Sequence, residues 1–269
     1  MDAPPRLAVE LSGLTRRFKS LTAVDRLSFE VLPKSIFGLL GSNGAGKTTV
    51  IKMLTTLLPP SAGTASVAGF DIAREPKEVR RHIGYVSQML SSDGELTGYE
   101  NLVISAKLYG LTGPERRKRI EQSLAFMELT DAAGRLVVHY SGGMIRRLEI
   151  AQSMLHRPAV LFLDEPTIGL DPLARHGVWR HIEELRDEFG TTVFMTTHDM
   201  DEAERLCETV AFMHRGKLVG LGTPRELKAK AGPGATLDDV FIELTGREPA
   251  EAGSYRDVAR TRRTAVRLD

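Results

Sequence analysis

Residues 41–49 read Gly-Ser-Asn-Gly-Ala-Gly-Lys-Thr-Thr, a complete G-x-x-x-x-G-K-[ST] phosphate-binding loop. The apolar run before it, residues 35–40, is typical of a buried strand, and residues 50–54 have the apolar spacing of a helix. In this context the glycines turn backbone N–H groups towards phosphate oxygens, and the helix N-terminus adds partial positive charge. The sequence therefore predicts that the chain binds a nucleoside triphosphate with Mg²⁺.

Each position of this loop has an expected contact. Lys47 is placed to reach the β- and γ-phosphates, and the hydroxyl of Thr48 to bind Mg²⁺. The predicted nucleotide-binding residues of the loop are Gly41, Ser42, Asn43, Gly44, Ala45, Gly46, Lys47, Thr48 and Thr49.

The composition of the chain is that of an ordinary globular protein. Its 269 residues are 42% hydrophobic and 26% charged, which suits one large domain or two small ones. Apolar runs such as residues 160–163 stop far short of the roughly 18 residues that span a membrane, and residues 1–6 lack the apolar core of a signal peptide. The single cysteine, Cys207, excludes an internal disulfide, and the net charge of +1 gives no basic footprint for nucleic acid. We therefore expect a soluble, cytoplasmic chain.

The hydrophobic pattern divides the chain into three kinds of structure. Period-two alternation over residues 7–37 predicts antiparallel strands, whereas residues 97–155 show helical spacing. From residue 160 onward, strands alternate with helices, which predicts a parallel sheet covered by helices. We expect an α/β nucleotide-binding domain over residues 1–230, with a small antiparallel sheet and a helical subdomain inserted at about residues 90–156.

The C-terminal part, residues 231–269, is expected to be a separate helix and tail. The breaker cluster at residues 231–235 is followed by Thr236, a plausible N-cap for a helix over residues 237–244. Arginines outnumber acidic residues from residue 247 to the end. This segment is either a mobile end or a contact for anionic lipid or a partner.

Two acidic residues follow the predicted strand at residues 160–163. An acid at the carboxyl end of a parallel strand lies where such sheets bind ligands. Asp164 is suited to hold Mg²⁺, and Glu165 to orient or deprotonate the water that attacks the γ-phosphorus. A phosphate loop with this pair of acids indicates a hydrolase.

Three further features complete the candidate site. Residues 140–144, Tyr-Ser-Gly-Gly-Met, open a helix with Ser141 as N-cap and with the N–H groups of Gly142 and Gly143 exposed, which makes a second anion-binding helix start. It can meet the phosphate loop on one nucleotide if two chains pack head to tail. His198 follows the last core strand, and Gln88, after the strand at residues 83–86, can reach Mg²⁺ or the attacking water.

Taken in order, these motifs resemble the nucleotide-binding subunit of an ATP-binding-cassette (ABC) transporter over residues 7–230. Residues 41–49 match Walker A, Gln88 the Q-loop, residues 140–144 the signature and residues 160–165 Walker B. Residues 169–171, ending in Asp171, match the D-loop, and His198 matches the switch histidine. Phe18 matches the aromatic residue that stacks on adenine.

The resemblance implies a RecA-like P-loop fold and a defined mechanism. Two ATP molecules would be sandwiched in a dimer, with Ser141 and Gly143 completing the γ-phosphate site of the other subunit and Asp171 connecting the two sites. Hydrolysis through Glu165 and His198 would reopen the dimer and drive a separate integral membrane permease at the cytoplasmic face of the membrane. Because every motif is intact on this chain, a homodimer is the simplest expectation.

The signature departs from the usual pattern at both ends. Tyr140 and Met144 replace the usual leucine and glutamine, and residues 236–246 share this branch's C-terminal pattern. Both features resemble the drug-efflux, daunorubicin-resistance-like branch, which implies export of a drug-like or lipid-like substrate. Phe18 replaces the commoner tyrosine but keeps a stacking face.

Two other classes of function compete with transport. A soluble ABC ATPase could act on ribosomes or nucleic acid, but translation-factor relatives carry two cassettes, and residues 49–140 show no sustained heptads for the coiled coil of DNA-repair relatives. A catalytically silent scaffold is disfavoured because Lys47, Asp164, Glu165 and His198 are all present. We therefore expect a transport ATPase and no nucleic-acid partner.

Overall fold

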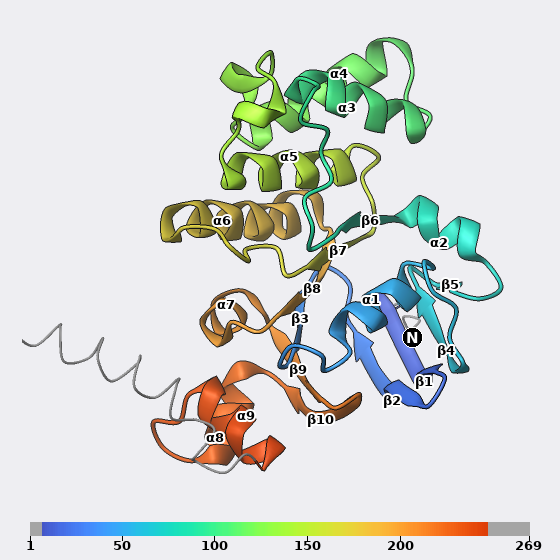
Figure 1. Cartoon of the computed structure of the whole chain (residues 1–269), viewed down its shortest axis with the longest axis vertical. Helices are drawn as coiled ribbons and strands as arrows, with labels where there is room; N and C mark the ends of the chain where they lie inside the picture. The colour runs from blue at the N-terminus through green and yellow to red at the C-terminus, as the bar shows by residue number, and fades with distance from the viewer. Residues whose placement is uncertain (1–6, 247–269) are drawn as a thin grey trace, which may run out of the picture.

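The computed structural model describes residues 7–246 (Figure 1). Its centre is a six-stranded sheet in which β6, β7, β8, β3 and β9 are parallel and β10 runs antiparallel to β9. Every residue of β3, β7 and β8 is buried, as expected for parallel strands covered on both faces. In spatial order the strands are β10 (Lys217–Gly222), β9 (Thr209–His214), β3 (Ile36–Leu40), β8 (Thr192–Thr197), β7 (Val160–Asp164) and β6 (Ile83–Val86).

A second, antiparallel sheet covers one side of the core. Phe29 stacks on Phe37 of β3 with ring centroids 5.1 Å apart, and Phe37 lies 5.2 Å from Phe194 of β8. These rings join the two sheets into one hydrophobic core, to which α1 (Lys47–Leu54) contributes its apolar face. The strands, in order, are β2 (Leu21–Val31), β1 (Val9–Phe18), β4 (Ala62–Val67) and β5 (Phe70–Asp71).

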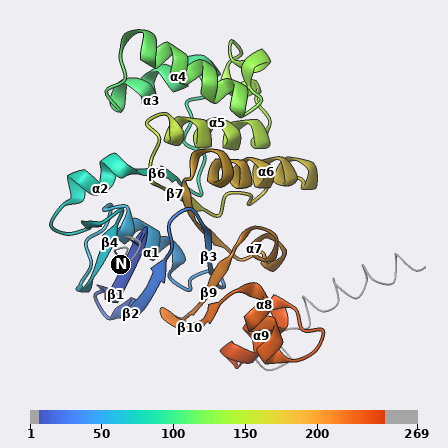
Figure 2. The same ribbon diagram turned by 180° about the vertical axis from the view of Figure 1, so that it is seen from behind.

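The other face of the central sheet packs against helices. Alternate residues of the same strands, such as Leu161 and Leu163 of β7, join a second core with the helices that follow in the chain. Figures 1 and 2 agree in placing α1 and the antiparallel sheet on one side and these helices on the other. They are α6 (Pro172–Phe189), α7 (Met200–Leu206), α8 (Pro224–Ala231) and α9 (Leu237–Thr245).

A helical part stands between β6 and β7 in the chain and forms the far end of the molecule in both views. It contains α3 (Gly98–Leu108), α4 (Gly113–Phe126), two short 3₁₀ turns and α5 (Gly142–Met154), whereas the short α2 (Pro76–His82) precedes β6. A capping box starts α3, because Thr97 accepts from the N–H of Glu100 while Glu100 accepts from the N–H of Thr97. The parallel core, small antiparallel sheet and inserted helices confirm the predicted fold class; the domain limits at residues 90, 156 and 230 stay predictions.

The sequence pattern missed some elements. The hydrophobic pattern did not show where α6 begins. The helix starts at Pro172, because Asp171 caps it by accepting from the N–H of Ala174. Strand β10, which the pattern did not predict, follows β9 through a two-residue turn at Arg215 and Gly216. Both turn residues have positive φ, a conformation that glycine at the second position favours in such hairpins. Thr236 caps α9 as predicted. The predicted arginine-rich tail, residues 247–269, lies outside the described residues, and none of the helices within residues 7–246 is long and apolar enough to span a bilayer.

Candidate nucleotide-binding and catalytic site

The phosphate loop connects the end of β3 to the start of α1. Residue 46 must be glycine, because its φ is 107° and an added Cβ would lie 2.4 Å from the carbonyl oxygen of Ala23. The loop is thereby held against β2, and α1 begins directly after it, with Lys47 as its first residue. This is the strand–loop–helix arrangement in which backbone N–H groups bind phosphate.

Lys47 lies in the centre of the site. Its side chain is 5% exposed, and its Nζ donates to the carbonyl oxygen of Gly41 at 2.7 Å and lies 3.2 Å from Oε1 of Glu165. A lysine this deeply buried requires such partners, since an unpaired buried charge is costly. Lys47 therefore joins the phosphate loop to Glu165, the residue that directly follows β7.

Asp164 ends β7 beside β8 and is buried. Its Oδ1 accepts a hydrogen bond of 2.5 Å from the hydroxyl of Thr196 and one of 3.3 Å from the hydroxyl of Thr48. Thr48 and Asp164, which are separated by 116 positions in the chain, thus present adjacent oxygen atoms. Burial, followed by the charge of Asp164, raises the pKa of the nearby Tyr85 to about 12, so this tyrosine stays neutral.

Glu165 has an unusual backbone conformation, with φ at 49°. For a residue with a Cβ, positive φ stores strain that the surroundings must offset. Here its N–H donates to the carbonyl and hydroxyl oxygens of Thr196, at 3.1 and 3.0 Å. The carboxylate then contacts Lys47 through Oε1 and Nδ1 of His198 through Oε2, the latter at 3.0 Å.

The segment after Glu165 is fixed by a buried carboxylate. Glu202 of α7 accepts hydrogen bonds from the Thr167 hydroxyl at 2.6 Å and from the Trp179 indole at 2.8 Å. Burial raises the pKa of the Glu202 carboxyl, while these donors oppose the rise. Thr167, in the segment between Glu165 and Asp171, is therefore bonded to the helix that begins just after His198.

Gln88 and Phe18 lie at the edges of this group of residues. Gln88 is exposed in the loop after β6, and its backbone carbonyl accepts from Nη2 of Arg146 at 3.0 Å. Phe18 ends β1 and is 41% exposed, with the guanidinium of Arg16 over its ring. Within the described residues the side chain of Gln88 forms no hydrogen bond to Lys47, Asp164 or Glu165.

The predicted signature segment, residues 140–144, lies away from the phosphate loop in the folded chain. Ser141 caps α5 by accepting from the N–H of Met144 at 3.3 Å, as predicted. Gly143 is packed so closely on α6 that an added Cβ would lie 2.8 Å from the Cβ of Ala174. Figures 1 and 2 show α5 and α1 on opposite sides of β6 and β7. Within one chain, residues 141–143 and the phosphate loop do not form a common site.

Comparison with known proteins agrees with this arrangement. The family model described as "ABC transporter" matches residues 24–168, which is more than half of the chain. The daunorubicin/doxorubicin resistance ATP-binding protein DrrA of Streptomyces peucetius is 45% identical over 86% of this chain and 70% of its own length. The chain belongs to the ABC transporter family of ATP-binding proteins.

Further relatives and solved structures show the same family. The probable multidrug ABC transporter ATP-binding protein YbhF of Escherichia coli is 40% identical over 90% of this chain, which spans only 42% of that protein. A solved ATP-binding subunit of an ABC transporter covers 88% of the chain and 99% of its own length with a TM-score of 0.79 and 30% identity. The dimeric cassette MJ0796, bound to ADP and Pi after hydrolysis, covers 80% and 98% with a TM-score of 0.72 and 25% identity. The chain is accordingly an ATP-binding and ATP-hydrolysing subunit.

The residues of this ABC subunit fit the ATP and Mg²⁺ that the family uses. Lys47 and the N–H groups at the start of α1 suit a triphosphate, while the adjacent oxygens of Thr48 and Asp164 suit Mg²⁺, which prefers oxygen ligands. Among residues 7–246 no group of three or more His, Cys, Asp or Glu side chains could hold a metal ion. Mg²⁺ would thus depend on few protein ligands and on phosphate oxygens, as is usual in phosphoryl-transfer sites.

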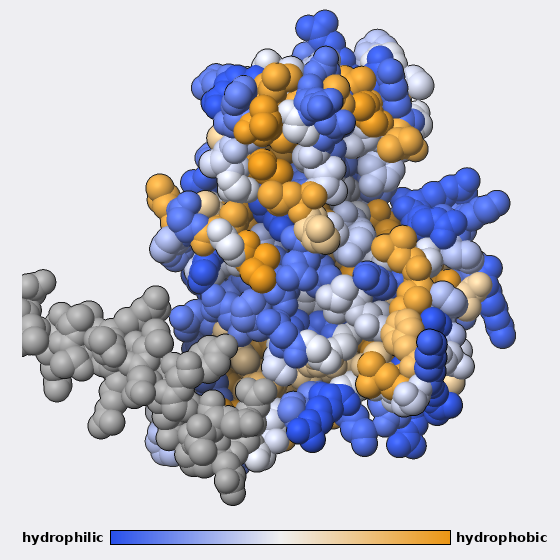
Figure 3. All heavy atoms as spheres, in the orientation of Figure 1, coloured by the Kyte–Doolittle hydropathy of each residue, from blue (hydrophilic) through white to orange (hydrophobic). Residues whose placement is uncertain are grey.

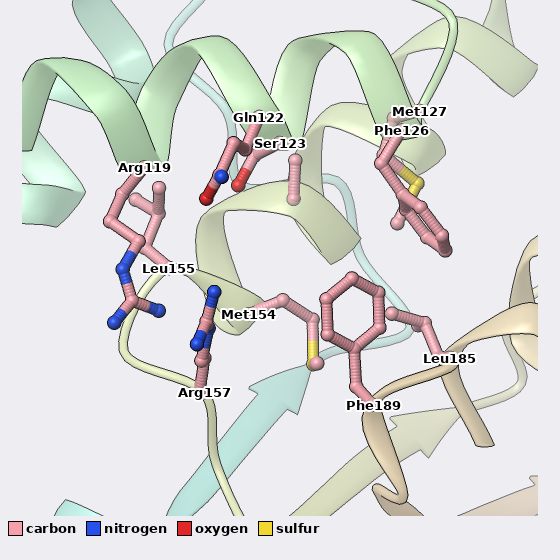
Figure 4. Close-up of a pocket in the computed structure, with 11 residues that line it drawn as sticks. Arg119, Gln122, Ser123, Phe126, Met127, Met154, Leu155, Arg157, Leu185 and Phe189 are labelled. Carbon is pink, nitrogen blue, oxygen red and sulfur yellow. The ribbon is translucent and has the colours of Figure 1, made fainter. Parts of the chain in front are cut away.

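A separate hollow lies between α4, α5 and α6 (Figure 4). Phe126, Met154, Leu185 and Phe189 form its apolar lining, and Arg119 and Arg157 lie at one side. None of the residues that line it belongs to the phosphate loop or to the acids of β7. This hollow is therefore no part of the ATP site.

Two participants were missed by the sequence reasoning. Thr196, two residues before His198, donates its hydroxyl hydrogen bond to Asp164 and accepts one from the N–H of Glu165. Arg146 is 2% exposed in α5 and pairs with Glu149 at 3.0 Å, an i,i+3 spacing that was visible in the sequence. Neither hydrogen-bonding role could be assigned, because strand and helix positions alone do not say which polar side chains are buried.

Proposed function

We propose that two copies of this chain close around two ATP molecules, with each ATP between the phosphate loop of one copy and Ser141–Gly143 of the other. The observation that carries the proposal is the convergence of Lys47, Thr48, Asp164, Glu165 and His198, joined by contacts of 3.0–3.3 Å across three elements. The separation of Ser141 from this group within one chain supports completion by a second copy. The dimeric state of MJ0796 supports it further.

In the proposed reaction each residue has one role. Lys47 and the N–H groups of residues 42–49 bind the phosphates, and Phe18 stacks on adenine. When bound, Mg²⁺ at Thr48 and Asp164 supplies positive charge that neutralises the phosphates. Water attacks the γ-phosphorus, Glu165 takes the proton of that water, and the bond to the bridging oxygen of ADP breaks.

The remaining residues orient this step. His198 hydrogen-bonds Glu165 at 3.0 Å and holds the carboxylate towards the attacking water. Gln88 approaches the water and Mg²⁺ from its exposed loop, while Ser141 and Gly143 of the second copy bind the γ-phosphate. Asp171, which is exposed at the start of α6, contacts the second copy and connects the two sites.

The partner that we propose is an integral membrane permease at the cytoplasmic face of the membrane. The helical part of the chain carries exposed apolar side chains: Leu108 is 82% exposed, Met89 81% and Val138 66%. Figure 3 shows hydrophobic surface over the region of α3 to α5. An exposed apolar patch of this kind marks an interaction site. The resistance and multidrug names of the relatives favour export of a drug-like substrate.

A reconstitution experiment tests this proposal. The tagged chain is purified from its own membranes, and the multi-pass protein that accompanies it is placed in lipid vesicles with the purified chain. We expect the ATPase rate to rise several-fold, and we expect Leu108→Glu to abolish that rise while basal hydrolysis continues. Leu32→Glu, at a site 59% exposed between β2 and β3, is the control and should preserve the rise. Capture of ribosomes or DNA with no membrane protein would contradict the transport function.

A further inference from the structure

The ring of Phe18 is held from one side by a neighbouring arginine. The guanidinium carbon of Arg16 lies 4.6 Å from the centroid of the Phe18 ring, within the range of a cation–π contact. Residues two apart on a strand project to the same face, so this contact follows from the position of both residues in β1. Phe18 remains 41% exposed, which leaves ring surface available for another planar group.

The arginine is itself fixed in place. Its Nη1 donates to the carbonyl oxygen of Pro59 at 2.7 Å, whereas its Nε is buried without a hydrogen-bond partner. The backbone on both sides of Arg16 is bonded to the same segment, since Ser61 donates to the carbonyl oxygen of Thr15 at 2.7 Å and its hydroxyl accepts from the N–H of Arg17 at 3.0 Å. Arg16 is therefore a rigid support, although it lies next to a hairpin end.

This support is placed close to the phosphate loop. Phe18 pairs with Leu21 at the end of the hairpin between β1 and β2. Two residues further on, the carbonyl oxygen of Ala23 is in close contact with Gly46 of the loop. A nucleotide whose phosphates lie on the loop thus has its base near the hairpin end, at the open side of the Phe18 ring.

We propose that Arg16 is a positioning residue for base recognition: it fixes the Phe18 ring so that adenine stacks on an already ordered surface. The inference rests on the proposed role of Phe18 in binding adenine. Ordering an exposed side chain on binding costs affinity, and a ring that is already ordered avoids that cost. The effect of Arg16 must then act through Phe18 and must depend on the base of the ligand.

Two other roles of Arg16 make different predictions. If its charge simply attracted the phosphates, the loss of Arg16 would weaken ATP and a base-free polyphosphate alike. If it only tied β1 to the segment at residues 59–61, its loss would lower the melting temperature without selective loss of ATP binding. A comparison of ligands with and without a base separates these roles.

The experiment measures dissociation constants of the isolated, full-length chain by calorimetry, with Mg-ATP and with Mg-tripolyphosphate. Arg16→Ala is expected to weaken ATP binding about 3- to 10-fold and to leave tripolyphosphate binding within about twofold. Arg16→Gln, which keeps a polar group of similar length, is the second variant if alanine lowers the melting temperature. Arg17→Ala is the matched control, because Arg17 is exposed on the opposite face of the strand, and it should change neither constant.

A double mutant decides whether Arg16 acts through Phe18. Arg16→Ala should add nothing to Phe18→Ala, since the support has no effect once the ring is gone. Equal loss of both ligands in Arg16→Ala, or full additivity in the double mutant, would overturn the inference while leaving the role of Phe18 intact. If Phe18→Ala itself binds ATP normally, the proposed adenine contact is wrong, and the inference fails with it.

Discussion

Replacement of Glu165 by glutamine tests the catalytic assignment most directly. The change keeps the size of the side chain but removes its negative charge and its capacity to accept a proton. Loss of a positioned general base typically costs 10²- to 10⁴-fold in rate, so we expect turnover to fall by about that factor. The affinity for ATP should rise, because Glu165 lies 3.2 Å from Lys47 and competes with phosphate for the positive charge of the lysine.

The size of the binding effect can be estimated from the site. The side chains of Lys47 and Glu165 are 5% and 8% exposed, so their charges are poorly screened. A carboxylate about 4 Å from a phosphate oxygen would repel it by up to about 4 kcal/mol at an effective dielectric constant of 20. Even a third of that repulsion corresponds to about tenfold in affinity. We therefore expect Glu165→Gln to bind ATP about tenfold more tightly, or better.

The assays are single-turnover hydrolysis for the chemical step, a fluorescent ATP analogue for affinity and sedimentation for the oligomeric state. ATP should hold Glu165→Gln as a dimer, since hydrolysis no longer reopens it. Glu204→Gln is the control, because Glu204 is exposed on α7 and pairs with Lys228 of α8. This change should leave all three readouts unchanged. Hydrolysis within about tenfold of the wild-type rate would refute the assignment of Glu165 as the base.

Three further predictions concern other parts of the molecule. Lys47→Ala should abolish measurable ATP binding, and normal binding would show that the loop is not the phosphate site. Ser141→Arg should leave ATP binding by the monomer intact but prevent the ATP-dependent dimer seen by sedimentation; if it behaved like Lys47→Ala, completion of the site by a second copy would be wrong. Arg146→Met should cost about 3–5 kcal/mol in urea unfolding because it leaves Glu149 buried and unpaired, whereas Arg146→Met with Glu149→Leu should recover most of that loss. Equal destabilisation by the single and double variants would show that the ion pair is not the cause.

The sequence predicted the structure best where a backbone conformation accepts only one type of residue. The phosphate loop requires glycine at residue 46, and an acid at the end of a buried strand, such as Asp164, is expected to lie at the ligand-binding edge. Contacts that depend on side-chain direction could not be predicted in this way. Thr196 and Arg146 both lie within regular elements, and only packing decides that the one supports two acids and the other is buried.

The arrangement of the motifs in space could be predicted only in part. Residues 140–144 and the phosphate loop were expected to share a nucleotide only across two chains, and the fold separates α5 from α1 by the strands β6 and β7. The sequence predicted both strands correctly, at residues 83–86 and 160–163. The close packing of Gly143 on α6 had no counterpart in the sequence pattern, since a glycine after an N-cap is equally compatible with an exposed helix start.

One helix connects two of the residues that we place around ATP. Ser141 caps α5, and further along the same helix Arg146 donates to the carbonyl oxygens of Ser87 and Gln88 at 2.7 and 3.0 Å. Glu149 extends this attachment by accepting from the N–H of Ser91. Because Arg146 is buried, breaking its bonds to these carbonyl oxygens would leave guanidinium donors without acceptors in the interior. We therefore expect a movement of the loop that carries Gln88 to move α5 and Ser141 with it. This would link the proposed Gln88 contact in one ATP site to the proposed Ser141 contact in the other.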